Sequence, residues 1–311
     1  MMSDHRDVVV VGGGPAGLSA AVYAARARLN PLVLETLTVP SQAILTDLLE
    51  NMPGFPEGIG GLDFVESLKK QALKFGAVLQ NAVVTGVRPD AAGGFLVETE
   101  ESVVRSKAVI IATGQHWRPL GVEGENALVG KGVSYCGVCD APIFKGKPCV
   151  VVGGGNTALQ EALYIARFAS RVYLVHRRTQ FRGSPLLVER VRRTPNVEIV
   201  VPAVVESVRG DGRLEAVLVR DLATGRPREI TCDGLFVFVG RVPNTTFLRG
   251  VLSVDDAGYV VVDANLATSV PGVYAAGDCR VTPLRQVVTA CADGAIAAES
   301  VYRYLSGAGH T

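Results

Sequence analysis

Two cysteines three positions apart, followed at once by an acid, are the residues best suited to chemistry. The segment SYCGVCD (Ser134–Asp140) contains Cys136, Cys139 and Asp140. Such a CxxC pair could be half of a zinc site, a structural disulfide, or a dithiol that opens and closes during catalysis. A structural zinc site needs four ligands, usually from a second CxxC or a histidine pair. The chain has no second CxxC and its four histidines are scattered, so we predict no metal site and a redox-active pair.

The spacing of the pair suits redox chemistry in two ways. Cysteines at i and i+3 of a helical turn lie close enough for a disulfide, and a CxxC motif lowers the pKa of one thiol so that its thiolate can attack. Asp140 could carry the proton that moves when the disulfide opens, or complement the dipole of a helix that starts there. The four other cysteines lie in apolar or helix-like runs and are predicted to be buried, inert thiols: Cys149, Cys232, Cys279 and Cys291.

A glycine-rich pattern that occurs twice indicates how such a pair would receive electrons. DVVVVGGGPAGLSAAVYAARARLNPLVLE (7–35) recurs in outline at residues 148–178. Each copy has a β-branched run, a glycine turn, an Ala- and Leu-rich helix and a second strand. The two copies predict an α/β protein with two Rossmann-like, three-layer nucleotide-binding domains.

The glycines have separate predicted roles. Gly12 and Gly153 allow a tight turn out of the strand, Gly14 and Gly155 let the backbone approach a pyrophosphate, and Gly17 lets the first helix pack closely on its strand. The phosphate would then meet a helix N-terminus, where free N–H groups favour an anion. The alternative is a pair of glycine-rich turns that bind nothing.

The residue after each second strand indicates which nucleotide binds. Glu35 ends the first copy, where a carboxylate accepts hydrogen bonds from ribose hydroxyls and repels a 2′-phosphate, so FAD or NAD fits there. The second copy ends in a basic cluster, His176, Arg177, Arg178 and Arg182. Arginine forks bind phosphate, so we expect NADPH, with a solvated basic patch as the alternative.

Composition sets the broad class. A chain of 311 residues suggests about two domains, and 48% hydrophobic residues allow a sizeable core. A formal net charge of +1 gives no field for nucleic acid. The N-terminus lacks the pattern of a signal peptide, and no apolar run approaches membrane-spanning length. We therefore expect a cytoplasmic protein that contacts neither nucleic acid nor membrane.

Taken together, the motifs resemble the low-molecular-weight thioredoxin reductases of bacteria and plants, which are FAD-dependent pyridine nucleotide-disulfide oxidoreductases. The resemblance covers essentially the whole chain. Besides CxxCD and HRRxxxR, it is carried by four segments: ENMPGFPEGIGG (50–61), IIATGQHWRPL (110–120), VFVGRVPN (237–244) and VYAAGDCRVTPLRQVVTACADGAIAA (273–298).

The resemblance implies a domain organisation. Residues 1–116 and 245–311 would form the FAD-binding domain, and residues 117–244, which carry the CxxC, an NADPH-binding domain inserted into it. Hinges near Gly114–Trp117 and Gly240–Asn244 would let one domain rotate on the other. The family also implies a homodimer that associates through the FAD domain.

The resemblance also implies roles for single residues. NADPH would pass a hydride to FAD, and the electrons would then reduce the Cys136–Cys139 disulfide, which exchanges with thioredoxin. Cys139 would lie against the flavin, Cys136 would attack the partner disulfide, and Asp140 would be the acid/base.

The implied cofactor contacts come from both halves of the chain. Those to FAD are Gly12, Gly14, Pro15, Ala16, Glu35, Gln42, Asn51, Ala112, Gly277, Asp278, Arg285 and Gln286. Those to NADPH are Gly153, Gly155, Asn156, Thr157, His176, Arg177, Arg178 and Arg182.

Several positions depart from the family pattern. Residues 40–42 read PSQ where GGQ is usual, Asn156 and Gln160 stand where acids are usual, and Gly137-Val138 replaces the frequent Ala-Thr inside the CxxC. These changes could relax the choice between NADPH and NADH and shift the dithiol potential. Two alternatives therefore remain: a flavoprotein of the same fold acting on another thioredoxin-like protein or small dithiol, and a flavin-binding sensor without turnover.

Overall fold

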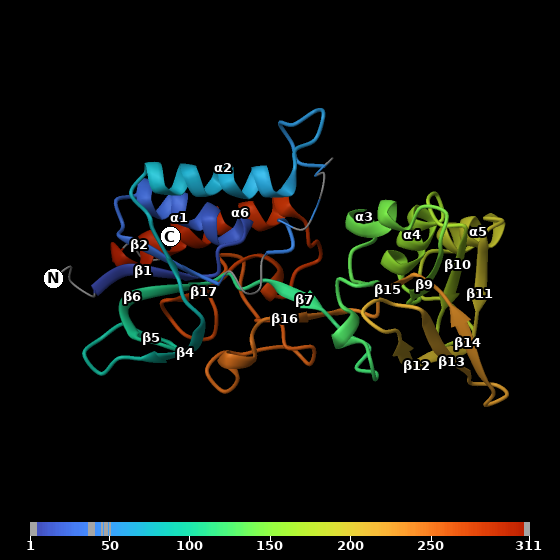
Figure 1. The fold of residues 1–311 in the computed structure, drawn as a ribbon. Helices are drawn as coiled ribbons and strands as arrows, with labels where there is room; N and C mark the ends of the chain where they lie inside the picture. The colour runs from blue at the N-terminus through green and yellow to red at the C-terminus, as the bar shows by residue number, and fades with distance from the viewer. Residues whose placement is uncertain (1–4, 37–40, 45, 47–48, 50, 308–311) are drawn as a thin grey trace. The chain divides into compact units, whose positions relative to one another are not determined.

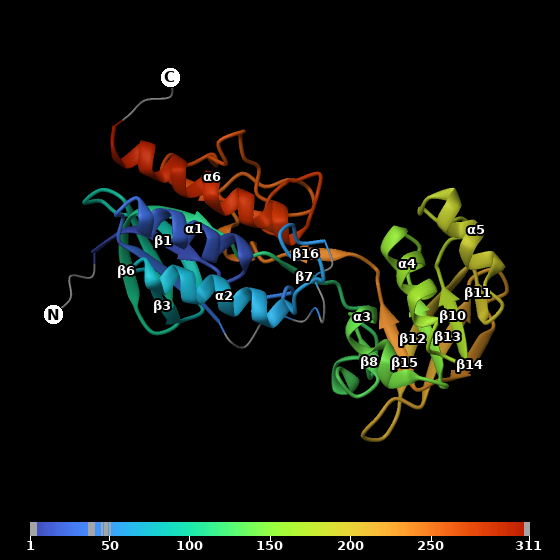
Figure 2. The ribbon, with the colours of Figure 1, turned by 90° about the horizontal axis from the view of Figure 1, so that it is seen from above.

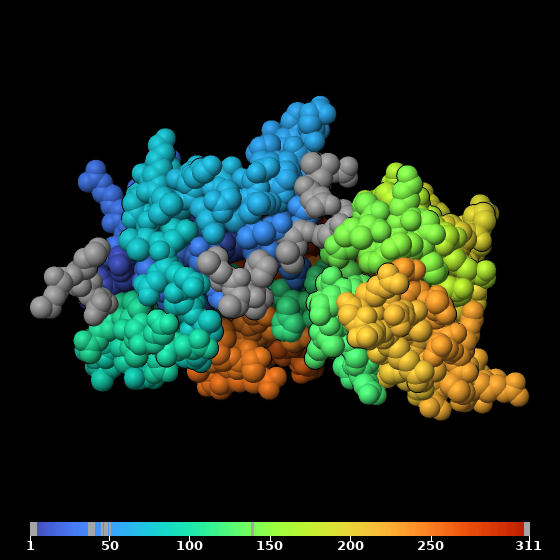
Figure 3. Space-filling model, viewed as in Figure 1, coloured from blue at the N-terminus to red at the C-terminus, as the bar shows by residue number. Residues whose placement is uncertain are grey.

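The chain folds into two units. The computed structural model describes residues 5–36, 41–44, 46, 49 and 51–307, with the side chains of Val138 and Cys139 outside the description. One unit contains the residues up to His116 and those from Val242 onward, and the other contains Trp117–Arg241. In Figure 3, blue and cyan segments lie in one unit, and the middle of the chain, coloured from green through yellow to light orange, forms the other.

The first unit is built on a mixed sheet. Its strand order is β3 (Val78–Asn81), β2 (Pro31–Glu35), β1 (His5–Val11), β6 (Val103–Ile111), β5 (Phe95–Thr99) and β4 (Val84–Pro89), and β17 (Val273–Ala275) also pairs with β6. Strands β3, β2, β1, β6 and β17 pair in parallel. The pairs β6–β5 and β5–β4 are antiparallel. Val8–Val11 of the central strand are buried on both faces, as a covered parallel strand requires.

Three helices cover one face of this sheet. Figure 2, which looks onto this face, shows α6 (Val287–Leu305), α1 (Pro15–Arg26) and α2 (Gly61–Lys74) side by side in front of the sheet. A Cβ atom on Gly294 of α6 would overlap the Ala16 carbonyl of α1, so the two helices approach to backbone contact. The many small residues of α1 and α6 serve this close packing.

The second unit repeats the plan. Its parallel sheet has the order β11 (Val197–Val200), β10 (Arg171–Val175), β9 (Pro148–Val152), β15 (Gly234–Val237) and β8 (Val133–Ser134). Figure 1 shows α4 (Asn156–Ile165) and α5 (Pro185–Arg193) on one face, and the antiparallel sheet β12 (Ala203–Arg209), β13 (Ala216–Asp221), β14 (Pro227–Thr231) on the other. The buried side chains divide accordingly, with Val151 in the helical layer and Val150 in the layer under β12–β14. The predicted α/β class with two Rossmann-like units is confirmed.

The two connections between the units pair with each other. β7 (Gln115–Trp117) and β16 (Arg241–Pro243) form a two-stranded sheet. Asn244 lies in the first unit, where its Nδ2 donates to the Thr113 carbonyl at 2.8 Å and its backbone N–H to the Gly114 carbonyl at 3.0 Å. The chain thus re-enters the first unit at Val242.

Within the described part of the chain, none of the helices is long and apolar enough to cross a membrane.

Candidate active site

The cysteine pair belongs to a single helical turn in the second unit. α3 (Gly137–Asp140) follows Cys136, and the Asp140 N–H donates to the Cys136 carbonyl at 3.3 Å. The Cys136 N–H donates to Ser134 Oγ at 3.0 Å, which fixes the entry to the turn. Cys136 is disulfide-bonded; the side chain of Cys139 lies outside the described residues. Asp140 is half-buried and lines a cavity of about 240 Å³.

The four other cysteines are free thiols in environments that disfavour the thiolate. Burial is the main cause: it raises the pKa of Cys149 and Cys232 to about 12 and that of Cys279 and Cys291 to about 11. Cys149, Cys232 and Cys279 are buried, whereas Cys291 is half-buried. Reactive thiol chemistry is therefore concentrated at Cys136 and its turn.

The first glycine turn has the geometry that its sequence predicts. Gly12 has a φ of +115°, and a Cβ on Gly17 would overlap the Gly12 carbonyl. Gly14 is the N-cap of α1 and no side chain caps that helix end. Its Cβ direction meets only the Cβ of Ser41, at 3.4 Å. The helix N-terminus thus keeps free N–H groups beside an open backbone, which suits a pyrophosphate.

The middle glycine of each triplet has a packing role that was not among those predicted for the glycines. A Cβ on Gly13 would overlap the Glu35 carboxylate, and a Cβ on Gly154 would overlap the His176 ring. Glu35 and His176 therefore occupy equivalent places in the two units, each packed on its glycine turn. Only the unbroken GGG, present in both copies, pointed to this. Glu35 also pairs with Lys69 Nζ of α2 at 3.1 Å, a partner the sequence did not indicate.

The basic cluster of the second unit divides into a buried and an exposed part. The His176 ring stacks on Phe181 at 5.5 Å and is 7% exposed. Burial is the main cause that lowers the pKa of His176. A backbone hydrogen bond with Gln180 opposes the shift and the nearby arginine charges add to it, so that the neutral ring is favoured. Arg177, Arg178 and Arg182 remain exposed. The cationic surface that could bind a phosphate is therefore made by the arginines rather than by His176.

The N-terminus of α4 resembles that of α1. Gly155 is its N-cap, no side chain caps it, and no atom lies within 4 Å of the Cβ direction of Gly155. Asn156 supports the neighbouring loop: its Oδ1 accepts from the Ser184 N–H at 2.7 Å. Thr157 is exposed on the first turn.

In the first unit, several residues expected near a flavin lie together. Asn51 Nδ2 donates to Gln286 Oε1 at 3.0 Å, and Gln42 Nε2 donates to the Gln115 carbonyl at 2.6 Å. Gln115 Nε2 in turn donates to Asp278 Oδ2 at 2.7 Å. The structure thus joins segments separated by more than 200 residues along the chain (Asn51 and Gln286). Gln115 was absent from the predicted set; Pro40, the first residue of PSQ, lies outside the described residues.

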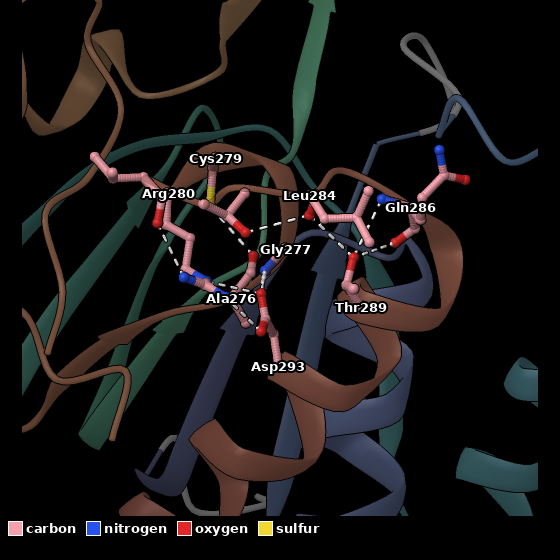
Figure 4. A network of polar contacts seen from close by, with 10 residues as sticks. Ala276, Gly277, Cys279, Arg280, Leu284, Gln286, Thr289 and Asp293 are labelled. Carbon is pink, nitrogen blue, oxygen red and sulfur yellow. Dashed lines mark hydrogen bonds and ion pairs between the residues drawn. The ribbon is translucent and has the colours of Figure 1, made fainter. Parts of the chain in front are cut away.

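The turn that carries Asp278 is fixed to α6. Gly277, with a φ of +76°, donates its N–H to Asp293 Oδ2 at 2.9 Å. Arg280 binds both oxygens of Asp293, at 2.7 and 2.6 Å (Figure 4). Gln286 caps the same helix through a reciprocal pair with Thr289. Residues 277–280, which we call the flavin-side turn because Asp278 is expected to face a flavin, are therefore joined by hydrogen bonds to the first two turns of α6.

The arrangement fits dinucleotides in both units. Three buried polar atoms without a hydrogen-bond partner lie near the predicted contacts: Ser41 Oγ, Arg285 Nε and His176 Nε2. Each is a donor or acceptor that a ligand can satisfy. The uncapped helix N-termini and the exposed arginines supply the donors that phosphates need. Among the described residues, no group of His, Cys, Asp and Glu could hold a metal ion.

Comparisons with known proteins agree with this architecture. The sequence matches the family model for pyridine nucleotide-disulphide oxidoreductases over residues 6–294. A thioredoxin reductase of Treponema pallidum (strain Nichols) is 42% identical over 305 residues, covering 98% of each chain, and one of Peptoclostridium acidaminophilum is 40% identical over 311 residues, again covering 98% of each. The solved structure of Lactococcus lactis thioredoxin reductase has a TM-score of 0.83 at 34% identity and covers 97% of this chain and 99% of its own. The resemblance inferred from the motifs is confirmed: this chain belongs to the pyridine nucleotide-disulphide oxidoreductase family, among the thioredoxin reductases.

Proposed function

We propose that this protein uses NADPH to reduce the disulfide of thioredoxin, with FAD as the intermediate carrier. The observation that carries the proposal is the disulfide of Cys136 at the start of a helical turn, within a unit whose glycine turn is open to a dinucleotide. The relatives named thioredoxin reductase, at about 40% identity over nearly the full length, support the same choice.

FAD is proposed to bind the first unit. Bound there, it would accept two electrons from the nicotinamide and pass them to the disulfide. The turn at Gly14 and the N-terminus of α1 would hold its pyrophosphate, and Glu35 would accept from its ribose hydroxyls while Lys69 balances the carboxylate charge. Asp278, which accepts from Gln115, and Arg285, which lies over the ring of Tyr259, would also contact the cofactor.

The nicotinamide nucleotide is proposed to bind the second unit. The Gly155 turn would take the pyrophosphate, and Arg177, Arg178 and Arg182 the 2′-phosphate. A triple alanine variant of these arginines should lose kcat/KM for NADPH by about a hundredfold while that for NADH changes little. An equal loss for both nucleotides would show that the cluster does not read the 2′-phosphate.

We propose for the cysteines the roles that the family resemblance implies. Two electrons convert the Cys136–Cys139 disulfide to a dithiol. The Cys136 thiolate then attacks one sulfur of oxidised thioredoxin and forms a mixed disulfide, which Cys139 resolves, so that the enzyme disulfide re-forms and thioredoxin leaves as a dithiol. Asp140, half-buried at the end of the turn, would give and take the proton that these steps require.

A turnover assay tests the proposal. Purified protein should contain FAD and oxidise NADPH when oxidised thioredoxin is added, and more slowly with glutaredoxin-like proteins or small disulfides. Rapid turnover with one of those substrates but none with thioredoxin would instead favour the alternative disulfide reductase. A flavin that NADPH never reduces would favour the sensor.

We propose two further properties. The first is a homodimer that associates through the first unit: Leu62 and Leu73 of α2 are 53% and 54% exposed, and their spacing places them on one helix face. Sedimentation equilibrium would test it, and a monomer at micromolar concentration would contradict it.

The second is a cytoplasmic location, which the four free thiols support. A fluorescent fusion found outside the cytoplasm would contradict it.

A change of orientation between the units during turnover is also proposed. Gly114 (φ +65°) and Gly240 (φ +130°) stand at the two connections, and no atom lies within 4 Å of either Cβ direction. Such positions absorb dihedral changes at low cost. A cross-link between the units should block turnover and spare FAD binding; undiminished turnover would contradict the proposal.

A further inference from the structure

We propose that Gln115 is a positioning residue of the flavin site, which holds Asp278 directly and Arg285 through Tyr259. The inference rests on the proposed function, since it assumes that these residues meet a bound flavin. Neither Gln115 nor Tyr259 was among the residues that the sequence suggested for the site.

Both polar atoms of the Gln115 side chain make hydrogen bonds within this site. The side chain is buried, with the residue only 5% exposed. Its Nε2 donates to Asp278 Oδ2 at 2.7 Å, and its Oε1 accepts from the Tyr259 hydroxyl at 3.1 Å. A carboxylate can only accept, so the orientation of the amide is set by Asp278 rather than chosen freely. Its backbone carbonyl accepts from Gln42 Nε2 at 2.6 Å.

Tyr259 extends the arrangement to Arg285. The guanidinium carbon of Arg285 lies 4.2 Å from the centre of the Tyr259 ring, and Arg285 Nε is buried without a hydrogen-bond partner. The contact with the ring therefore restrains the position of the guanidinium while leaving Nε available to a ligand. Tyr259 is itself held by Asp255 Oδ1, which accepts its backbone N–H at 2.9 Å.

Stability alone does not explain a glutamine at this position. A buried amide costs desolvation that an apolar side chain of similar size avoids. Its contacts go to Gln42 and Asp278, both expected to face the flavin, and through Tyr259 to Arg285. Gln115 also begins β7, the strand that leads out of the first unit. The residue thus joins the outgoing strand to the acid of the flavin-side turn.

Three variants separate positioning from folding. Gln115→Met keeps the length of the side chain and removes both hydrogen bonds. Tyr259→Phe keeps the ring under Arg285 and removes one bond. Gln115→Glu keeps an acceptor for Tyr259 but places a second carboxylate beside Asp278. The two carboxylates repel each other, and the repulsion falls when one of them is protonated. Gln80→Ala, an exposed glutamine of β3, is the control.

The measurement is titration of the apoprotein with FAD, together with the visible spectrum of the bound flavin and the thermal midpoint of the apoprotein. We expect Gln115→Met to raise the Kd for FAD about tenfold or more and to shift the spectrum. We expect Tyr259→Phe to have a smaller effect of the same sign, and the control none. Gln115→Glu should bind FAD weakly near pH 8 and recover as the pH falls toward 5, a response that a purely structural role would not produce.

The outcomes are distinguishable. Wild-type affinity and spectrum in a folded Gln115→Met protein would overturn the inference. If that variant does not fold, Tyr259→Phe and Gln115→Glu decide, and wild-type FAD binding by both at about pH 8 would overturn it. Failure of the wild-type protein to bind FAD would instead overturn the proposed function.

Discussion

Glu161 of α4 presses its carboxylate against Gly137, the first residue after Cys136, so closely that a Cβ on Gly137 would overlap Glu161 Oε2. That oxygen is buried and has no hydrogen-bond partner. Burial raises the pKa of Glu161 to about 7, and only the charge of Arg241 opposes the shift. The buried Glu161 carboxylate therefore fills the space beside Gly137, the first residue of the CxxC turn. Its charge changes near neutral pH.

The first prediction concerns the pH dependence of stability. The pKa of Glu161 is raised from its ordinary 4.5 to about 7 in the folded protein. The stability that the protonated carboxyl contributes is therefore fully present below about pH 4.5 and is lost as the pH rises through about 7. Between about pH 5 and pH 8, the free energy of unfolding of Glu161→Gln should rise relative to wild type by about 2–3 kcal/mol. Urea unfolding at both pH values measures this. Glu189→Gln, an exposed acid of α5, is the control; a Glu161→Gln curve parallel to wild type would contradict the assignment.

The second prediction is a coupling between Gly137 and Glu161. Alanine favours a helix over glycine by about 1 kcal/mol, but a methyl group on Gly137 must displace the Glu161 carboxylate. Gly137→Ala should therefore stabilise the protein in a Glu161→Ala background and fail to do so in the wild type. A double-mutant cycle at about pH 8 should give a coupling of about 1–3 kcal/mol. Additive effects would show that the two side chains do not compete.

The third prediction concerns the pair that fixes the flavin-side turn. Asp293 and Arg280 are 9% and 15% exposed, and Asp293 also accepts from the Gly277 N–H. Removing the charge with Asp293→Asn leaves Arg280 buried and unpaired, which should cost about 3–5 kcal/mol of the free energy of unfolding. Glu299→Gln breaks an exposed pair with Arg303 on the same helix and should cost less than about 0.5 kcal/mol. Equal costs would show that burial does not distinguish the pairs.

Local patterns in the sequence predicted the parts that depend on local geometry. The glycine spacing predicted the turn at Gly12 and the close packing at Gly17, because both follow from backbone conformation within a few residues. The i, i+3 spacing of Cys136 and Cys139 likewise predicted a helical turn, which α3 provides. The place of Glu35 at the end of β2 followed from the strand pattern.

Other features depend on segments that are distant in the sequence. Gln115 is 163 residues from Asp278 and 144 from Tyr259, and no local signal marks either contact. His176 was read as part of a basic cluster, yet its side chain packs inward on Gly154 and stacks on Phe181. The local sequence shows a histidine near three arginines, but only the tertiary fold decides which of these side chains is buried.

The most direct test of the account follows the electrons to the cysteine pair. Anaerobic protein is mixed with NADPH and then with oxidised thioredoxin, and both the flavin absorbance and the thioredoxin thiols are measured. In the Cys136→Ser/Cys139→Ser variant, NADPH should still bleach the flavin, but thioredoxin should stay oxidised, whereas wild type and a Cys291→Ser control should reduce it. Reduction of thioredoxin by the double variant at the wild-type rate would contradict the central claim.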